Sequence, residues 1–240
     1  TRCNIINGGK GGCVMVRNRA FGKLNETYNI ILRGNILTSG KVDEPLAVFG
    51  WLGFVHDIDI FDNEVFATGA SFGIDVFSID AKGHTGHLSD VRILRNTISG
   101  GNTGGIGIKG GARRVIAEHN VIEDTKNDGV FIHTGGMQLP DAREVIVRKN
   151  IIRNTGRHGV LATGTDISLV DNIITSCGAA GVYASGNGIE VKQNNIANAK
   201  PGVLIIGDRI QVRQNLLTNA VISILKDYRP FVSDNVILKK

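Results

Sequence analysis

The stretch "VIVRKNIIRNTGRHGVLATG", residues 145–164, contains one complete unit of the repeat that decides the fold. A second unit, "ISLVDNIITSCGAAGVYASG", occupies residues 167–186. Both units place an Asn after an alternating apolar run, an Ile two positions beyond that Asn, and a Gly that opens a second short apolar run. Self-similarity of this kind predicts a solenoid, in which each unit packs only against its neighbours.

The repeat extends over the whole chain, and its alternating apolar and polar residues have the period of a strand. The units are too short for a strand–helix–strand crossover, so each strand must pair with the same strand of the neighbouring units. The sequence therefore predicts an all-β parallel solenoid of about ten coils, with residues 1–240 as one domain. The aligned Asn residues lie at positions 35, 63, 96, 120, 150, 172, 194, 215 and 235, with Asn4 as a tenth member.

The Asn column has a structural interpretation. Side-chain amides stacked at the strand spacing of about 4.8 Å can hydrogen-bond to one another and form an Asn ladder. We therefore assign these Asn residues to the fold and look elsewhere for the functional residues.

The Asn column, the coil length and Gly-opened strands such as "GVFIHTG" from residue 129 resemble the right-handed parallel β-helices of the pectin-lyase-like superfamily. The resemblance covers the whole chain and implies a right-handed, single-stranded parallel β-helix. That superfamily includes polygalacturonase-type hydrolases, pectate and alginate lyases, alginate epimerases and phage tailspikes. The implied ligand is a polysaccharide, and the implied location is extracellular, on a cell surface or on a virion. Neither end shows the usual cap, so we expect a fragment of a longer chain or a partner that covers the ends.

Composition limits the choice of partner. The formal net charge of +5 permits an anionic partner, and we favour an acidic polysaccharide. Nucleic acid is not expected, because the outward basic residues Arg148, Lys192 and Arg213 have no aromatic residues between them. No run approaches the roughly 18 apolar residues of a membrane span, so we expect no membrane partner.

Alignment of the second strands predicts one outer face that carries the candidate catalytic residues. Asp75 falls in one outward column, and Lys109 and His133 fall in the next. The adjacent pair Asp43 and Glu44 leads into the equivalent strand one coil earlier. Aromatic residues near these positions are candidates for stacking on sugar rings, namely Phe49, Trp51, Phe77, Phe131 and Tyr183.

Carboxyl groups on neighbouring coils suit glycoside hydrolysis, the mechanism that we prefer from sequence. One carboxyl must stay protonated while another is ionised, and strands about 4.8 Å apart place such groups within the required range. Asp43, Glu44 and Asp75 would supply these groups, while Lys109 and His133 would contact an anionic sugar. The structural alternative makes Asp43 and Glu44 turn residues and makes Asp75 and Lys109 an exposed ion pair of little energetic value.

The resemblance to known enzymes of the superfamily is partial at the site. "VDEPLAVFG", "FGIDVFS" and "GIGIKGG" occupy the coils that in polygalacturonase-type hydrolases carry an Asp pair, a Gly-His-Gly and an Arg-Ile-Lys. Here Asp-Glu replaces Asp-Asp, no His precedes Ile74, and Lys109 lacks its Arg. The Asp-Pro-His signature of alginate epimerases is also incomplete, because Val76 and Phe77 follow Asp75.

Two further functions stay open from sequence. A lyase or epimerase would use Lys109 or His133 as the base that removes a proton beside a uronate carboxyl. We expect no cofactor and no metal, except Ca²⁺ if the protein is a lyase. The other alternative is a non-catalytic shaft or glycan-binding segment of a trimeric phage tailspike. In that homotrimer the outward residues Leu161, Leu204 and Ile206 would form the subunit contact.

Overall fold

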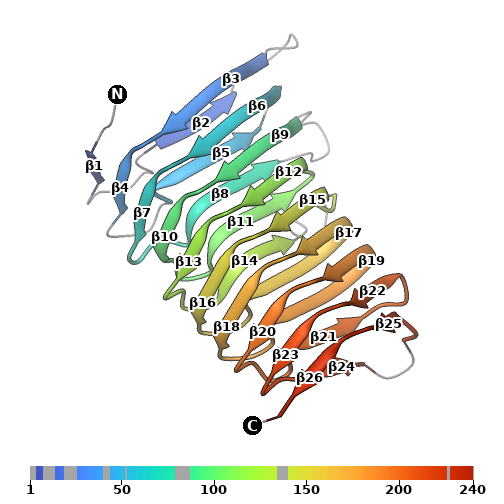
Figure 1. The fold of residues 1–240 in the computed structure, drawn as a ribbon. Coiled ribbons are helices and arrows are strands. Elements are labelled where there is room, and N and C mark those ends of the chain that lie inside the picture. The colour runs from blue at the N-terminus through green and yellow to red at the C-terminus, as the bar shows by residue number, and fades with distance from the viewer. Residues whose placement is uncertain are drawn as a thin grey trace.

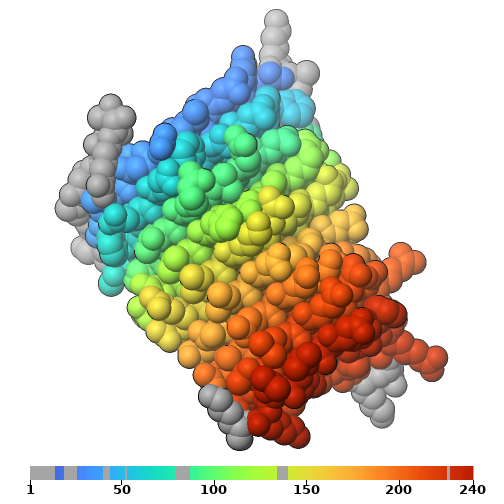
Figure 2. All heavy atoms as spheres, in the orientation of Figure 1, coloured from blue at the N-terminus to red at the C-terminus, as the bar shows by residue number. Residues whose placement is uncertain are grey.

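The computed structural model describes residues 4–7, 14–18, 26–39, 44–51, 53–78, 87–133, 140–225 and 228–239. These ranges form strands and turns and contain no helix. The strands stack along one axis with the two termini at opposite ends (Figure 1), and successive coils appear as parallel bands on the surface (Figure 2). The predicted parallel β-helix is therefore confirmed.

Three parallel sheets form the faces of the β-helix, and successive coils contribute neighbouring strands to each sheet. The long strands β17 and β19 pass through both sheet 1 and sheet 2 and join them into one sheet of 16 strands. Sheet 1 contains β2 (Val14–Asn18), β5 (Leu46–Gly50), β8 (Phe72–Ser78), β11 (Gly104–Gly110), β14 (Asp128–His133), the first parts of β17 (Val160–Val170) and β19 (Val182–Lys192), β21 (Val203–Ile206) and β24 (Ile222–Ile224).

Sheets 2 and 3 lie on either side of the Asn-containing turn. Sheet 2 contains β3 (Glu26–Arg33), β6 (Phe54–Phe61), β9 (His87–Leu94), β12 (Arg113–Glu118), β15 (Arg143–Arg148), the second parts of β17 and β19, β22 (Ile210–Arg213) and β25 (Phe231–Ser233). Sheet 3 contains β1 (Asn4–Asn7), β4 (Ile36–Ser39), β7 (Glu64–Ala67), β10 (Thr97–Gly100), β13 (Val121–Glu123), β16 (Ile151–Thr155), β18 (Ile173–Cys177), β20 (Asn195–Ala197), β23 (Leu216–Thr218) and β26 (Val236–Leu238).

The core is a column of aliphatic side chains inside the coils. Residues that alternate along the strands, such as Val145 and Val147 of β15, are fully buried, and their polar neighbours face outward. The two-residue period read from the sequence is therefore the in–out alternation of the strands. Burial of this apolar surface is the main stabilising contribution to the fold.

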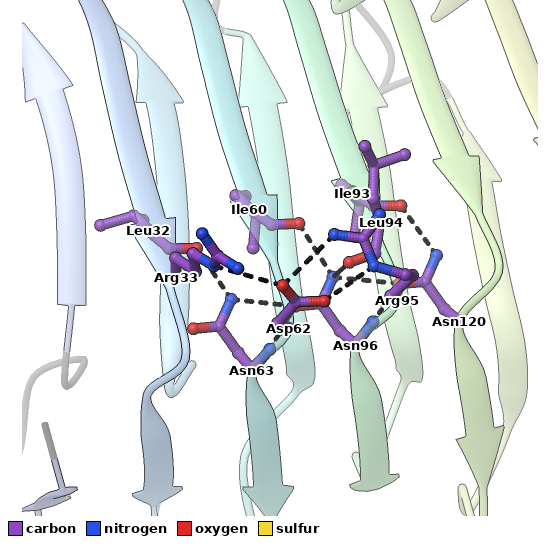
Figure 3. A network of polar contacts seen from close by, with 10 residues as sticks. All are labelled: Leu32, Arg33, Ile60, Asp62, Asn63, Ile93, Leu94, Arg95, Asn96 and Asn120. Carbon is purple, nitrogen blue, oxygen red and sulfur yellow. Dashed lines mark hydrogen bonds and ion pairs between the residues drawn. The ribbon is translucent and has the colours of Figure 1, made fainter. Parts of the chain in front are cut away.

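The Asn ladder runs along the turn between sheets 2 and 3, as predicted. Within the ladder, an Asn donates one side-chain N–H to the amide oxygen of the next coil's Asn and another to a backbone carbonyl of the previous coil, as Figure 3 shows for Asn63 and Asn96. The described members are Asn35, Asn63, Asn96, Asn120, Asn150, Asn172, Asn194, Asn215 and Asn235.

Asn4 does not occupy the ladder position, so this part of the prediction is wrong. In the register between β1 and β4, Asn4 pairs with Ile36, the residue after the ladder Asn35. The match by residue type is therefore displaced by one position.

A column of glycines opens the strands of sheet 1 because a side chain there would collide with the core. A Cβ atom at each would lie 2.3–2.7 Å from a side-chain carbon of the Ile or Leu that follows a ladder Asn. The glycines are Gly73, Gly105, Gly129, Gly159, Gly181 and Gly202.

Replacing Gly129 by alanine should lower the free energy of unfolding by about 2 kcal/mol, because the added methyl overpacks the coil. Its Cβ would lie 2.4 Å from Cγ2 of Ile152 and 2.5 Å from the carbonyl oxygen of Gly159. Urea unfolding measures the change. Gly34→Asn is the control, because that site is open and its positive φ is one that Asn tolerates. An alanine variant as stable as this control would contradict the predicted collision.

Candidate functional site

The candidate residues of sheet 1 lie in the register that the sequence predicted. Strands β5, β8, β11 and β14 pair in parallel, so outward residues of successive coils form columns. One column is Ala47, Asp75, Gly107 and Phe131, and the next is Phe49, Phe77, Lys109 and His133. The predicted shared face of Asp75, Lys109 and His133 is therefore confirmed, while their chemical role remains a prediction.

Asp75 and Lys109 form an ion pair between neighbouring coils, with 2.9 Å between Lys109 Nζ and Asp75 Oδ2. The exposed pair considered from sequence is wrong, because Asp75 is only 2% exposed and the Lys109 side chain 18% exposed. Lys109 Nζ also lies 4.3 Å from the ring centroid of Phe72 and 5.0 Å from that of Phe77. The ammonium group is thus held between a carboxylate and two aromatic faces, all of which attract a cation.

Aromatic rings close over this pair on the outside of sheet 1. Phe131 lies between Phe72 and His133, with ring centroids 5.6 Å and 5.3 Å away. Phe49 meets Phe77 edge-on at 6.1 Å. We call these five residues the aromatic cover. Each of the predicted sugar-stacking residues Phe49, Phe77 and Phe131 therefore packs against another ring of this cover, and Phe77 also contacts the Lys109 ammonium.

Gly107 provides the space in which the Asp75 carboxyl and the Phe72 ring lie. A Cβ at Gly107 would be 2.8 Å from Asp75 Oδ1 and 2.9 Å from Phe72 Cδ1. Because any side chain at this position would displace one of the two, the glycine allows an outward carboxyl to be buried without entering the core.

The surroundings of Asp75 raise the pKa of its carboxyl to about 7. Burial is the largest cause, the Lys109 ammonium opposes it, and the negative charge of Glu44 adds to it. Asp75 Oδ1 is buried and has no hydrogen-bond partner among the described residues. Near neutral pH the group therefore exists in both protonation states, as a group that transfers protons requires.

The remaining predicted site residues belong neither to the Asp75–Lys109 pair nor to the aromatic cover. Asp43 lies outside the described residues, whereas Glu44 is half-buried just before β5. Trp51 follows β5 and is 38% exposed. Tyr183 lies on β19, two coils beyond Phe131, so its ring is not part of the aromatic cover. Leu161, expected on an exposed trimer surface, is buried, which corrects that prediction.

A second polar cluster on sheet 1 was missed from sequence. Asp128 is fully buried and accepts hydrogen bonds from Arg157 at both carboxylate oxygens and from the backbone N–H of His158. The Arg157 side chain stays 43% exposed, so its guanidinium is held in place and still reachable from solvent. Burial lowers the pKa of His158, whose Nδ1 accepts the N–H of Ala180.

A sequence signal for this cluster existed in the glycine column. Asp128 directly precedes Gly129, and His158 directly precedes Gly159, so both occupy the position before the column. Phe72 holds the same position before Gly73. The position directly before a column glycine therefore supplies Phe72, Asp128 and His158 to these two clusters.

The described residues contain no group of three or more His, Cys, Asp or Glu side chains arranged to hold a metal ion. The parts of the chain that the structure describes include no helix long and apolar enough to cross a membrane.

Comparisons with known proteins define the class. A family model described as "Right handed beta helix region" matches residues 133–222. Together with the parallel coils and the Asn ladder, this match identifies the fold as a right-handed parallel β-helix. No protein in the search of curated sequences matches this chain.

Solved structures with the same fold belong to bacterial and phage proteins. The A-module of mannuronan C-5 epimerase AlgE6 from Azotobacter vinelandii has a TM-score of 0.71 and 15% identity, covering 94% of this chain and 63% of that one. The periplasmic alginate epimerase AlgG has a TM-score of 0.58 and 17% identity, covering 89% and 46%. Tailspike protein 2 of Escherichia coli O157:H7 bacteriophage CAB120 has a TM-score of 0.62 and 11% identity, covering 88% and 32%. The chain thus spans less than two thirds of each of these three structures.

Proposed function

We propose that this β-helix binds an acidic polysaccharide along the outer face of sheet 1 and transfers a proton at a uronate residue, as a lyase or an epimerase does. The buried Asp75–Lys109 pair carries the proposal, because a carboxyl with a pKa of about 7 lies 2.9 Å from an amine. Two of the similar structures are named as epimerases of mannuronan and of alginate, and this supports an acidic substrate.

The chemistry begins within the pair. Movement of one Lys109 proton to Asp75, whose burial favours the protonated carboxyl, leaves an uncharged amine and an uncharged carboxyl. The amine then accepts the proton from C5 of the uronate, and the electron pair left on C5 is shared with the sugar carboxyl. In a lyase that pair forms the C4–C5 double bond and expels the O4 oxygen, which takes up a proton from water. In an epimerase a proton from water returns to C5 on the opposite side of the ring.

Arg157 supports the acidic substrate in a separate way. Its guanidinium is oriented by the buried Asp128, the first residue of β14 in sheet 1, and remains partly exposed. An oriented guanidinium is well suited to bind a carboxylate through paired hydrogen bonds. We therefore assign Arg157 to the binding of a sugar carboxylate and Asp128 to the positioning of Arg157.

The rings around Lys109 could also contact the sugar. Phe77, Phe131 and His133 are half-buried, so part of each ring surface faces solvent beside the Lys109 amine. Rings placed in this way can pack on the apolar face of a sugar while the amine reaches C5. Trp51 and Tyr183 remain candidates for more distant sugar contacts.

Carboxylate hydrolysis is the second candidate, and the influence of Glu44 on the pKa of Asp75 favours it. A protonated acid beside an ionised carboxylate is the arrangement that glycosidases use. Asp43 would be a further carboxylate of that mechanism. The burial of Asp75 makes this candidate weaker, since the acid must reach the glycosidic oxygen.

Location and assembly follow from the proposed substrate. An acidic polysaccharide of this kind lies outside the cytoplasm, so we place the protein in the periplasm, outside the cell or on a virion. A homotrimer remains a prediction of the tailspike alternative, in which the chain binds glycan without cleaving it.

The test incubates the protein and its Lys109→Met variant with alginate, pectate and a neutral glucan. Ultraviolet absorbance detects a lyase, nuclear magnetic resonance of the uronate detects an epimerase, and reducing ends without absorbance detect a hydrolase. We expect a uronate product that falls by a factor of about 100 to 10,000 in Lys109→Met. Lys126→Met is the matched control, because Lys126 is an exposed lysine outside the site.

Each product pattern has one meaning. Reducing ends without absorbance that are lost in Glu44→Gln would replace the proposal with hydrolysis. Absence of product from every polysaccharide, with a folded protein, would overturn enzymatic activity on these substrates and leave the glycan-binding alternative.

A further inference from the structure

A groove lies on the outer face of sheet 2, away from the candidate site on sheet 1. Its volume is about 940 Å³, and it crosses six coils from β3 to β17. Exposed or half-buried aliphatic side chains from successive coils, namely Ile31, Ile116 and Ile146, contribute to its lining. A cavity of this size is within the range of ligand sites. The proposed function on sheet 1 makes no use of this groove.

One residue on each coil enters the groove from a left-handed backbone position. These residues have φ values between 50° and 56° and form a column parallel to the axis of the β-helix. Asn and Asp tolerate this conformation, so the backbone alone explains part of the column. The backbone does not explain Arg114 and Glu144, because Arg and Glu are not among the residue types that favour this conformation. The column is Asn29, Asp57, Asp90, Arg114, Glu144 and Asp166.

The groove is acidic although the chain is basic. Its lining contains five carboxylates (Asp57, Asp59, Asp90, Glu144 and Asp166) and two guanidinium groups (Arg92 and Arg114), a formal charge of −3 in a chain of +5. Each guanidinium is already paired with one of these carboxylates, at 2.5 Å in one pair and 2.7 Å in the other.

The acidic residues outside those two pairs carry the excess charge. Asp57 contacts His56 at 2.8 Å, a contact that is an ion pair only when the imidazole is protonated. Glu144 and Asp166 are exposed, and neither makes an ion pair with another described residue. The end of the groove near β15 and β17 therefore offers two carboxylates on adjacent coils, beside the aliphatic side chain of Ile146.

We propose that this groove binds an extended, basic segment of a partner protein. Lysine and arginine side chains combine an apolar stem with a charged head, so the stems can cover Ile116 and Ile146 while the heads reach Glu144 and Asp166. An acidic polysaccharide would meet net negative charge here. A neutral saccharide would find no aromatic ring in the lining on which to stack.

The experiment measures binding of a labelled short oligolysine peptide by fluorescence anisotropy at low salt. A chain of net charge +5 repels a polycation on average, so binding needs a local acidic site. We expect the double variant Glu144→Gln/Asp166→Asn to bind about tenfold more weakly. The matched control is Asp124→Asn/Asp171→Asn, which removes two exposed carboxylates outside the groove and should leave the affinity unchanged.

Further variants and ligands show whether oligolysine binds in this groove or is attracted unspecifically. Ile146→Arg, which places a cation in the lining, should also weaken oligolysine binding while the chain stays folded. Equal weakening in the groove variant and in the control would overturn the proposal in favour of unspecific attraction. Absence of oligolysine binding, or tighter binding of neutral or acidic oligosaccharides than of oligolysine in this groove, would overturn it as well. Polysaccharide turnover by the groove variant stays at the wild-type level in each case, so failure here is distinct from failure of the sheet 1 site.

Discussion

Replacing Asn120 by alanine is expected to lower the free energy of unfolding by about 4 kcal/mol. Its amide oxygen accepts the backbone and side-chain N–H groups of Asn96 at 2.9 and 3.0 Å. Its side-chain nitrogen donates to Ile93 O at 2.8 Å and to Asn150 Oδ1 at 3.0 Å. The methyl group of alanine replaces none of these contacts, so buried polar atoms on the two neighbouring coils lose a partner at once. Urea unfolding followed by circular dichroism measures the loss.

Asn195→Ala is the matched control for the ladder. Asn195 is exposed on β20, and it belongs to the same coil as the ladder residue Asn194 without taking part in the ladder. Its replacement should change the free energy of unfolding by less than about 0.5 kcal/mol. Equal losses in the two variants would mean that the ladder contributes no more than an ordinary surface Asn.

The ladder and the glycine column could be predicted because a solenoid repeats its local rules in every coil. Alternation along a strand fixes which side chains enter the core, and a repeated Asn or Gly marks a repeated constraint. For that reason the outward columns of Asp75 and Lys109 were also predictable. Asn4 shows the limit of matching by residue type, because pairing with β4 places it one position beyond the ladder.

The burial of Asp75 could not be predicted, because alternation gives the direction of a side chain and not what covers it. The cover depends on Phe72, which precedes a column glycine, and on Phe131 from a later coil. It also depends on Gly107, whose missing side chain leaves space for both groups. These contacts join three coils whose spacing in sequence is irregular, so no single stretch contains the signal.

The groove on sheet 2 could not be predicted from the sequence either. Its column depends on a left-handed backbone at one residue per coil, and residue type signals this at Asp57 but not at Arg114 or Glu144. The charged residues there appeared in the sequence only as the polar half of the strand pattern. Their gathering into one acidic surface follows from the stacking of coils.

The contribution of Asp75 to stability should decrease as the pH rises from about 4 to about 7. The folded protein raises the pKa of this carboxyl from 3.8 to about 7, so within that range the folded state binds a proton that the unfolded state has released. The full contribution is therefore present below pH 4, and it is lost as the pH passes through the folded-state pKa. The total loss is on the order of 4 kcal/mol, at up to about 1.4 kcal/mol per pH unit.

Comparison with Asp75→Asn isolates this effect, because the amide has a similar shape and does not titrate in this range. The unfolding free energy of the wild type minus that of the variant should fall steadily between pH 4 and pH 7 and level off above it. A difference that rises with pH would mean that the Lys109 ion pair outweighs burial and lowers the pKa of Asp75. In that case Asp75 would be too weak a base to accept a proton from Lys109, as the first step of the proposed reaction requires. The same titration therefore tests both the electrostatics of the buried pair and the first step of the proposed reaction.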